Sequence, residues 1–531
     1  MTLRALKLGT RRSALARAQS GAVARELEHR HPGVRVELVG IDTRGDKILD
    51  QPLSAVEGKE FFTAEIDAAL LRGDIDFTVH SYKDLALQRD ARLRLAAVPC
   101  RQQPNDVVIF AADVRERLAA GQPLRIGSSS PRRASFVPPF LQEALPWRPD
   151  PIGTGTAGSA RVQLVELRGN VDSRLRRLHE PRGSARHLDG VVLAFAGIAR
   201  LWADETTRPQ LQQLLAGLPR QILPLSVCPS APAQGALAIE CRRDDAATAQ
   251  LLAVLDDATT RAAVGRERVL LDARGGGCQQ RFGAVYLTVP RLGALCYTRA
   301  AEEQDGALQI GPPRLDWTPA EPLPAPSAPV RAWDGSRVPA PAVVLSEEGI
   351  ARATQRLPEA HTLFVAHRRA LPEGVGLRVE AATHVWVPGP STWFALAKAG
   401  IWVEGCAEGL GIGTVAPLLV EPWLQLAPLP EWLVLTHGGA TEGWAAGSAV
   451  ATYSLAAPSQ LPVADATHIW WASGAQFAYW RAQVTAHSAN RIDAIAHACG
   501  PGKTYEQLRA AGVQNLRMFP QPQQWREWLQ R

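Results

Sequence analysis

One cysteine, Cys278, follows three consecutive glycines in the run Arg274–Gln279 (RGGGCQ). Glycine adopts backbone conformations that are closed to other residues and lets bulky groups approach the chain closely. A thiol on such a loop is well placed to carry a covalently attached group. A tight turn with an inert cysteine is the alternative, because free cysteine is among the residues most often buried.

An isolated acid–base run, His80–Asp84 (HSYKD), follows the apolar segment Ile75–Val79. Burial and neighbouring charges could tune the pKa of Asp84 for proton transfer, and its carboxylate could stabilise a developing cation. Lys83 could hold a substrate carboxylate. The alternative is an ordinary Lys–Asp pair at the surface end of a strand.

Arginines gather in loops that follow strand-like segments. The runs are Arg11–Ser13 (RRS), Gly127–Arg133 (GSSSPRR) and Leu167–Arg174 (LRGNVDSR). Backbone N–H groups and hydroxyls at a helix start form an anion site, and arginine grips carboxylates through two parallel hydrogen bonds. These runs therefore predict a site for a polycarboxylate or a phosphate.

Alternating strands and helices would position these loops. The patterns predict strands at 6–10, 34–39 and 75–79, helices at 13–31 and 61–71, and strands of a second lobe at 124–127 and 189–194. Such alternation indicates parallel sheets with helices on both faces. Ligands of these folds bind at the carboxyl ends of strands, where the basic and acidic runs fall.

The composition bounds the class of protein. A length of 531 residues suggests three to four domains, and no apolar run is long enough to span a membrane. Seven scattered cysteines without CxxC pairs favour a reducing, cytoplasmic location and give no zinc motif. The net charge of +6 is mild, and its arginines lie in loops with few stacking aromatics, so we expect small anions and not nucleic acid as ligands.

Tryptophan usage divides the chain, since thirteen of its fifteen tryptophans lie from Trp317 onward. A proline-rich stretch separates the halves. The second half repeats the pattern Thr-x3-Leu-x3-Gly-[Ile/Val], beginning at Thr392 and again at Thr504. Each copy reads as a glycine turn, a short helix and a new strand, which predicts two related α/β lobes. Chance recurrence of common helix signals is the alternative.

The first half resembles porphobilinogen deaminase, also called hydroxymethylbilane synthase. Seven motifs appear in family order across roughly residues 4–285: KLGTR (7–11), TRGDKILD (43–50), HSYKD (80–84), SSPRR (129–133), LRGNV (167–171), QGALAIECR (234–242) and GGCQ (276–279). The resemblance implies stepwise condensation of four porphobilinogen molecules into a linear tetrapyrrole, with release of ammonia.

The resemblance also implies roles for individual residues. Cys278 matches the thiol that carries the dipyrromethane cofactor, and Asp84 matches the catalytic carboxylate. Further cofactor contacts are implied for Asp46, Lys83, Ser129, Ser130, Arg132, Arg133, Arg168 and Arg174. Substrate contacts are implied for Arg11, Ser13, Lys59, Arg200 and Gln234. No metal is implied.

The second half is similar to uroporphyrinogen-III synthase, which closes hydroxymethylbilane into a ring. The similarity rests on the two-lobe repeat and on the segments 451–455 (ATYSL), 472–474 (ASG) and 502–504 (GKT). Tyr453, Ser473 and Thr504 match residues of that family's substrate site. A catalytically silent appendage is the alternative.

We therefore expect an α/β protein with two periplasmic-binding-protein-like, doubly wound lobes and a small α+β cofactor-carrying domain, followed by a two-lobed synthase-like region. The expected division is 1–100 with about 200–220 for the first lobe, 101–199 for the second, 221–310 for the cofactor-attachment domain, 311–345 for a linker and 346–531 for the last region. We expect a monomer. A non-catalytic, two-lobed anion-binding protein is the alternative of a different class.

Overall fold

The structure is a computed structural model of the whole chain. It describes residues 4–43, 63–146, 161–277, 280–335, 342–372, 374, 379–444, 447–457, 465–483, 492 and 494–531. Three residues of the predicted site, Asp46, Lys59 and Cys278, lie outside the described residues. The chain forms two compact units, of which the first comprises Met1–Glu143, Pro149–Leu287 and Cys296–Leu315, and the second comprises Ala144–Arg148, Thr288–Leu295 and Asp316–Arg531.

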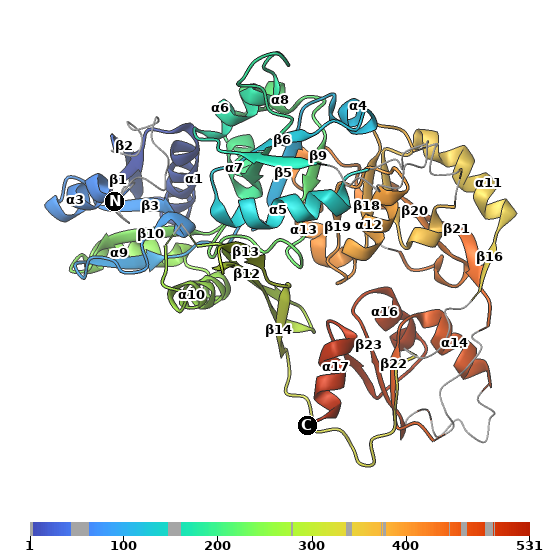
Figure 1. The fold of residues 1–531 in the computed structure, drawn as a ribbon. Coiled ribbons are helices and arrows are strands. Elements are labelled where there is room, and N and C mark those ends of the chain that lie inside the picture. The colour runs from blue at the N-terminus through green and yellow to red at the C-terminus, as the bar shows by residue number, and fades with distance from the viewer. Residues whose placement is uncertain are drawn as a thin grey trace. The chain divides into compact units, whose positions relative to one another are not determined.

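The first unit contains a five-stranded sheet with the strand order β2-β1-β3-β10-β4 (Figure 1). The elements of this lobe are β1 (Arg4–Arg11), α1 (Ala14–Arg30), β2 (Val34–Ile41), α3 (Ala64–Arg72), β3 (Phe77–Ser81), β4 (Leu93–Ala97) and β10 (Leu237–Arg242). β1 pairs in parallel with β2 and β3, whereas β10 runs antiparallel to β3 and β4. The predicted alternation of strands and helices in this region is confirmed.

A second five-stranded sheet repeats this arrangement in the order β7-β6-β8-β5-β9. Its lobe comprises β5 (Asp106–Phe110), α4 (Val114–Ala119), β6 (Leu124–Gly127), α5 (Pro131–Ala144), β7 (Val162–Val165), α6 (Val171–Leu175), β8 (Gly190–Ala194), α7 (Phe195–Ala203), α8 (Arg208–Leu215) and β9 (Arg220–Ile222). β6 is parallel to β7 and β8, and β5 is antiparallel to β8 and β9. Two lobes of one topology thus form the first unit.

The segment that returns the chain from the second lobe to the first differs from the one expected from sequence. We expected residues 200–220 to return to the first lobe, but β9 pairs with β5 of the second sheet. The return strand is β10, which we had placed in the cofactor-attachment domain. Its first five residues are buried, as expected for a strand between two neighbours in the interior of a sheet.

Two helices and a smaller antiparallel sheet follow these two lobes in the chain. The elements are α9 (Ala246–Leu252), α10 (Ala258–Asp272), β11 (Phe282–Val289), β12 (Gly293–Gln304), β13 (Ala307–Ile310) and β14 (Arg314–Pro319). β11 and β13 flank β12, and β14 also pairs with β12. The glycine run that precedes Cys278 connects α10 to this sheet.

The second unit contains a six-stranded sheet in the order β16-β21-β20-β17-β18-β19. The helices and strands of this lobe are β16 (Val343–Leu345), α11 (Glu347–Arg356), β17 (Thr362–Val365), β18 (His384–Val387), α12 (Pro390–Lys398), β19 (Gly405–Cys406), α13 (Ala416–Leu419), β20 (Leu433–His437) and β21 (Ser448–Leu455). All neighbours in it pair in parallel except β16 with β21.

A four-stranded parallel sheet, β15-β22-β23-β24, completes the second unit. Its elements are β15 (Ala332–Trp333), β22 (His468–Trp471), α14 (Gly474–Gln483), β23 (Ala496–Cys499), α16 (Lys503–Ala510), β24 (Leu516–Met518) and α17 (Pro522–Leu529). The short helix expected within each Thr-x3-Leu repeat is confirmed, as α12 and α16. The stretch treated as a linker supplies β15, and its Trp317 and Leu323 pack on the core of this lobe.

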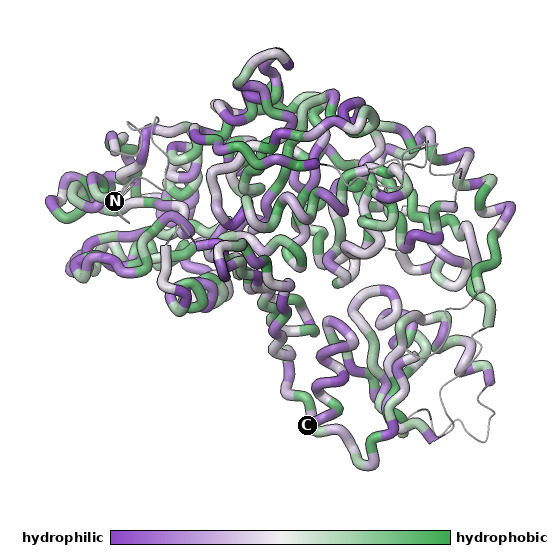
Figure 2. The backbone as a smooth tube through the Cα atoms, in the orientation of Figure 1, coloured by the Kyte–Doolittle hydropathy of each residue, from purple (hydrophilic) through white to green (hydrophobic). Residues whose placement is uncertain are grey.

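Each unit has its own apolar interior, and Figure 2 shows hydrophobic stretches running through both. Within the described part of the chain no single helix has the length and apolar character needed to cross a membrane. One bent pair of segments, Ile412–Leu419 with Pro422–Glu431, has the length and composition of a membrane span when the two segments are taken together. Leu418, Trp423 and Leu424 of that pair are buried in the fold.

Candidate functional site

The HSYKD run lies where the sequence analysis placed it, at the carboxyl end of β3. Tyr82–Asp84 form a single 3-10 turn directly after the strand, and the Tyr82 amide donates to the Ala236 carbonyl at 3.0 Å. This turn leaves the Asp84 side chain exposed. The Lys83 ammonium donates to Oε1 of Gln234 at 3.1 Å, so two predicted site residues are brought together.

Burial and charges of both signs act on the ammonium group of Lys83. Burial lowers the pKa of Lys83, and Arg133 and Arg132 lower it further, whereas Asp84 and Asp106 act in the opposite direction. Residues of both lobes therefore act on one ammonium group. A carboxylate bound beside Lys83 would favour the charged form of this ammonium and so offset the effect of burial.

A buried carboxylate that sequence reasoning missed, Asp106, anchors the two arginines of the SSPRR motif. Nη2 of Arg132 lies 2.7 Å from its Oδ2, and Nη2 of Arg133 lies 2.7 Å from its Oδ1. Nε2 of Gln234 donates to the same Oδ1 at 2.9 Å. Arg132 and Arg133 are buried and paired, so their role in the structure includes holding Asp106 as well as supplying positive charge.

The serines of the same motif lie at the start of α5, whose first residue is Pro131. Proline suits the first helical position because its fixed φ is already helical and it needs no N–H partner there. The Ser130 hydroxyl accepts from the Arg133 amide at 3.4 Å. Ser129 and Ser130 are both partly exposed, and they follow β6 at its carboxyl end.

Arg174 and Arg200 supply partly buried cations at the same edges of the sheets. Burial lowers the pKa of Arg174 to about 10, with further lowering by Arg133 and Arg168 and an opposite effect from Asp84. Burial also lowers the pKa of Arg200 to about 10. Arg174 donates to the Gly169 carbonyl and Arg200 to the Gly235 carbonyl, and no acidic side chain among the described residues pairs with either.

Two further predicted site residues, Arg11 and Ser13, lie between the end of β1 and the start of α1. Arg11 is the last residue of β1, and its charge contributes to lowering the pKa of His80. Ser13 is the N-cap of α1, and its hydroxyl accepts from the Ala16 amide at 3.3 Å. A capping role thus accounts for Ser13 in this structure, whatever else it contacts.

The glycines before Cys278 adopt the conformations that the sequence suggested. Gly275, Gly276 and Gly277 have φ values of 83°, 65° and 96°, all in the left-handed region that favours glycine. A Cβ on Gly276 would come within 2.6 Å of Cδ1 of Leu87. The run therefore has to be glycine-rich to approach the loop that follows Asp84.

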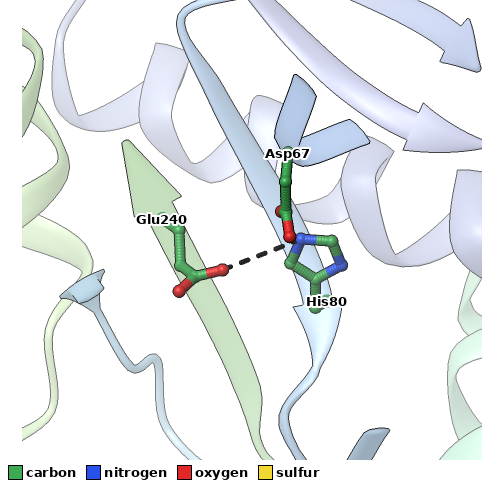
Figure 3. A group of neighbouring side chains, drawn as sticks. All are labelled: Asp67, His80 and Glu240. Carbon is green, nitrogen blue, oxygen red and sulfur yellow. Dashed lines mark ion pairs between the residues drawn. The ribbon is translucent and has the colours of Figure 1, made fainter. Parts of the chain in front are cut away.

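A buried acidic group lies behind the HSYKD turn. Asp67, His80 and Glu240 come together as Figure 3 shows, with Nε2 of His80 3.9 Å from Oε2 of Glu240. Nη2 of Arg89 lies 2.8 Å from both Asp67 and Glu240, so a metal ion would have to displace this cation. Burial and the charges of Arg89 and Arg11 lower the pKa of His80 to about 3, which keeps its ring neutral.

The three candidate residues of the second unit lie in two different lobes. Tyr453 is buried in β21 of the six-stranded sheet. Ser473 follows β22 and its hydroxyl accepts from the Gln476 amide at 3.3 Å, while Thr504 lies in the first turn of α16, after β23. Each thus lies toward the carboxyl end of a parallel strand.

A family model and several known proteins match about half of the chain. Residues 6–250 match the family described as "Porphobilinogen deaminase, dipyromethane cofactor binding domain". The porphobilinogen deaminase of Trichlorobacter lovleyi is 40% identical over 280 residues, which are 52% of this chain and 78% of the relative. That of Syntrophotalea carbinolica is 39% identical over 308 residues, or 58% of this chain and 86% of the relative. The chain belongs to the porphobilinogen deaminase family.

The family assignment confirms the coarse functional prediction for the first unit. Its activity is that of porphobilinogen deaminase, and the matched domain is the one that binds the dipyrromethane cofactor. Among solved structures, the methionine binding protein MetQ is similar over 50% of this chain and 93% of its own, with 13% identity and a TM-score of 0.26. A score that low carries no argument.

The side chains of the first unit fit such a cofactor. Each pyrrole of a dipyrromethane carries an acetate and a propionate, so the group is a polycarboxylate. The partly buried Lys83, Arg174 and Arg200 have pKa values lowered by burial, and for Lys83 and Arg174 by neighbouring arginines as well. Carboxylates at these positions would favour the charged forms of the three side chains and so offset the effect of burial.

Proposed function

We propose that the first unit builds hydroxymethylbilane from four porphobilinogen molecules on a dipyrromethane linked to Cys278, with Asp84 as the catalytic carboxylate. The observation that carries this assignment is the placement of Asp84, exposed at the end of β3 and electrostatically coupled to Lys83 and Arg174. A fixed carboxylate there stabilises the positive charge that develops as ammonia leaves the substrate.

The basic residues around Asp84 bind the carboxylates of the cofactor and of the growing chain in this proposal. Lys83, Arg168, Arg174 and the serines of the SSPRR motif hold the cofactor, and Arg11 and Arg200 hold the substrate. Arg132, Arg133 and Gln234 act partly through Asp106, which fixes their side chains. Asp46 and Lys59 keep the substrate or cofactor contacts that the family resemblance implies. The product passes on as a small molecule, from a cytoplasmic monomer with no nucleic acid or membrane partner.

The variant Asp84→Asn tests the catalytic role. We expect it to retain the covalent cofactor, seen as added mass, and to lose porphobilinogen consumption by a factor of 100 or more, on the order of what a positioned acid–base group contributes. Asp90→Asn is the matched control, because Asp90 lies in the following loop and pairs with the exposed Arg92. Equal rates in the Asp84 and Asp90 variants would contradict the assignment.

The second unit is proposed to close hydroxymethylbilane to uroporphyrinogen III. The proposal rests on its two α/β lobes, whose sheets are built mainly of parallel strands. It also rests on Tyr453, Ser473 and Thr504, which lie near the carboxyl ends of strands, where such folds bind ligands. Fusion gives an unstable intermediate a high local concentration at the second site. A deaminase with a silent second unit is the competing account.

Product analysis separates the two accounts. The full-length protein is supplied with porphobilinogen, the products are oxidised, and the uroporphyrin isomers are separated by chromatography. Predominance of isomer III supports the cyclase, and we expect Tyr453→Phe to shift the products toward isomer I. Isomer I alone from the unaltered protein, which is the result of spontaneous closure, would contradict the cyclase and leave the deaminase intact.

A further inference from the structure

Three polar side chains form a row across neighbouring parallel strands of the six-stranded sheet. β17 and β20 pair with Leu363 opposite Leu433, and continuing that register past the strand end aligns His367 with His437. β20 and β21 in turn place His437 opposite Tyr453, and the two rings lie 5.8 Å apart between centroids. The row lies at the carboxyl ends of β17 and β20, where ligands of parallel α/β sheets bind.

The two histidines share one local structure. Nδ1 of His367 accepts from the Arg369 amide at 3.2 Å, and Nδ1 of His437 accepts from the Gly439 amide at 3.2 Å. Each therefore caps a 3-10 turn, Arg368–Ala370 or Gly438–Ala440, at the end of its strand. Because Nδ1 is an acceptor, the proton of each neutral ring is on Nε2, and the row presents two N–H donors.

Positive charge surrounds these donors. His367 is partly covered by the surrounding protein, which lowers its pKa to about 4, with further lowering by Arg369, Arg368 and His437. Burial also lowers the pKa of His437 and raises that of Tyr453, on which Arg369 has an opposing effect. No acidic group among the described residues contributes to any of these three shifts. Part of the His367 side chain and the Arg368 side chain remain open to solvent, so a ligand from solution can reach this end of the row.

From this arrangement we infer that His367, Arg368, Arg369, His437 and Tyr453, named here the basic row, bind a carboxylate of a polycarboxylate ligand. Guanidinium groups pair with carboxylates in the planar, two-bond geometry that suits them. Neutral Nε2–H groups and a tyrosine hydroxyl add further donors. The inference deepens the proposed function of the second unit and rests on it for the natural ligand, since hydroxymethylbilane carries an acetate and a propionate on every ring.

Binding of uroporphyrin I to the full-length protein tests the basic row without requiring turnover. The tryptophan-rich second half supplies the fluorescence signal, because thirteen of the fifteen tryptophans lie there. Arg174→Ala is the background, since we expect it to weaken polycarboxylate binding in the first unit. In that background we expect Arg369→Gln and His437→Asn each to raise the Kd about tenfold or more, the loss expected for one hydrogen bond to a charged group. Asparagine retains an acceptor that can cap the Gly438–Ala440 turn.

The matched control is Arg352→Ala, which removes an exposed arginine from α11 in the same lobe and should leave the Kd unchanged. Thermal unfolding of each variant shows whether the fold is intact. The inference would be overturned if Arg369→Gln and His437→Asn both bound uroporphyrin I with the same Kd as Arg352→Ala. Loss of binding by the row variants together with only isomer I from the unaltered protein would support the site and reject cyclisation. If the unaltered protein produced isomer III and the row variants bound uroporphyrin I normally, the results would support cyclisation and reject the basic row as the binding site.

Discussion

Lys83 donates a 3.1 Å hydrogen bond to Gln234, although 151 residues separate them in sequence. The bond joins the turn that carries Asp84 to the turn before β10. From Gln234 the network continues to Asp106 at 2.9 Å, and thus to the arginines of α5. Gln234 is the link between the ammonium that we assign to cofactor binding and the buried carboxylate that fixes its neighbours.

Substitution Gln234→Ala should therefore reduce both activity and stability. Removing the amide frees Lys83 and takes away one of the N–H donors to Oδ1 of Asp106, so we expect a loss of about 1–3 kcal/mol in the free energy of unfolding. Steady-state kinetics should show a lower kcat with the cofactor still attached. Urea unfolding measures the stability, and unchanged kinetics in a destabilised variant would show that the link has no positioning role.

Asp106→Asn should be one of the most destabilising single changes in the first unit. It leaves the buried Arg132 and Arg133 without their common carboxylate, and breaking a buried pair in this way costs about 3–5 kcal/mol. Asp90→Asn, which disrupts an exposed pair with Arg92, serves as the control and should change stability little. Similar unfolding curves for the two variants would contradict the anchoring role.

The same carboxylate predicts how stability depends on pH. Burial by itself would raise the pKa of Asp106, but Arg132 and Arg133 outweigh it and hold that pKa well below its usual range. The resulting stabilisation is complete above the unfolded pKa of about 4 and is lost as the pH falls toward the folded value. Urea unfolding between pH 6 and pH 3 should show a steeper loss for the unaltered protein than for Asp106→Asn.

Much of this fold could be predicted from sequence, and the exceptions have a physical cause. Periodicity and turn residues located β1, α1, β6 and β8 because these signals are local. The roles of Asp106 and β10 are long-range: Asp106 meets Arg132 across 26 residues, and β10 joins β3 from across the second lobe. No local pattern reports such pairing. The alignment of His367 with His437 likewise depends on strand register, which sequence spacing does not reveal.

Arg89 neutralises the two buried carboxylates behind the site, so Arg89→Met should destabilise the first unit. Asp67 and Glu240 would be left buried without their cation, a loss of about 3–5 kcal/mol at neutral pH. Protonation of the carboxyls should reduce that difference at lower pH. Arg92→Met, which removes an exposed arginine that pairs with Asp90, is the control. A difference that does not depend on pH would contradict the pairing.

Arg174→Ala should weaken the binding of substrate and cofactor carboxylates. Its guanidinium is partly buried without a carboxylate partner among the described residues, as expected for a cation reserved for a ligand. We expect KM for porphobilinogen to rise about tenfold or more, the loss of one charge-assisted contact. Arg176→Ala removes an exposed arginine from the next turn and should leave KM unchanged. Equal KM values for Arg174→Ala and Arg176→Ala would exclude Arg174 from the site.

The covalent state of Cys278 tests the central claim most directly. Peptide-level mass spectrometry of the purified, full-length protein should locate the added mass of a dipyrromethane on Cys278 and none on Cys100, an exposed thiol in the same unit. Cys278→Ser should lack the added mass and lose activity, while Cys100→Ser should retain both. Unmodified Cys278 in protein that consumes porphobilinogen would contradict the account.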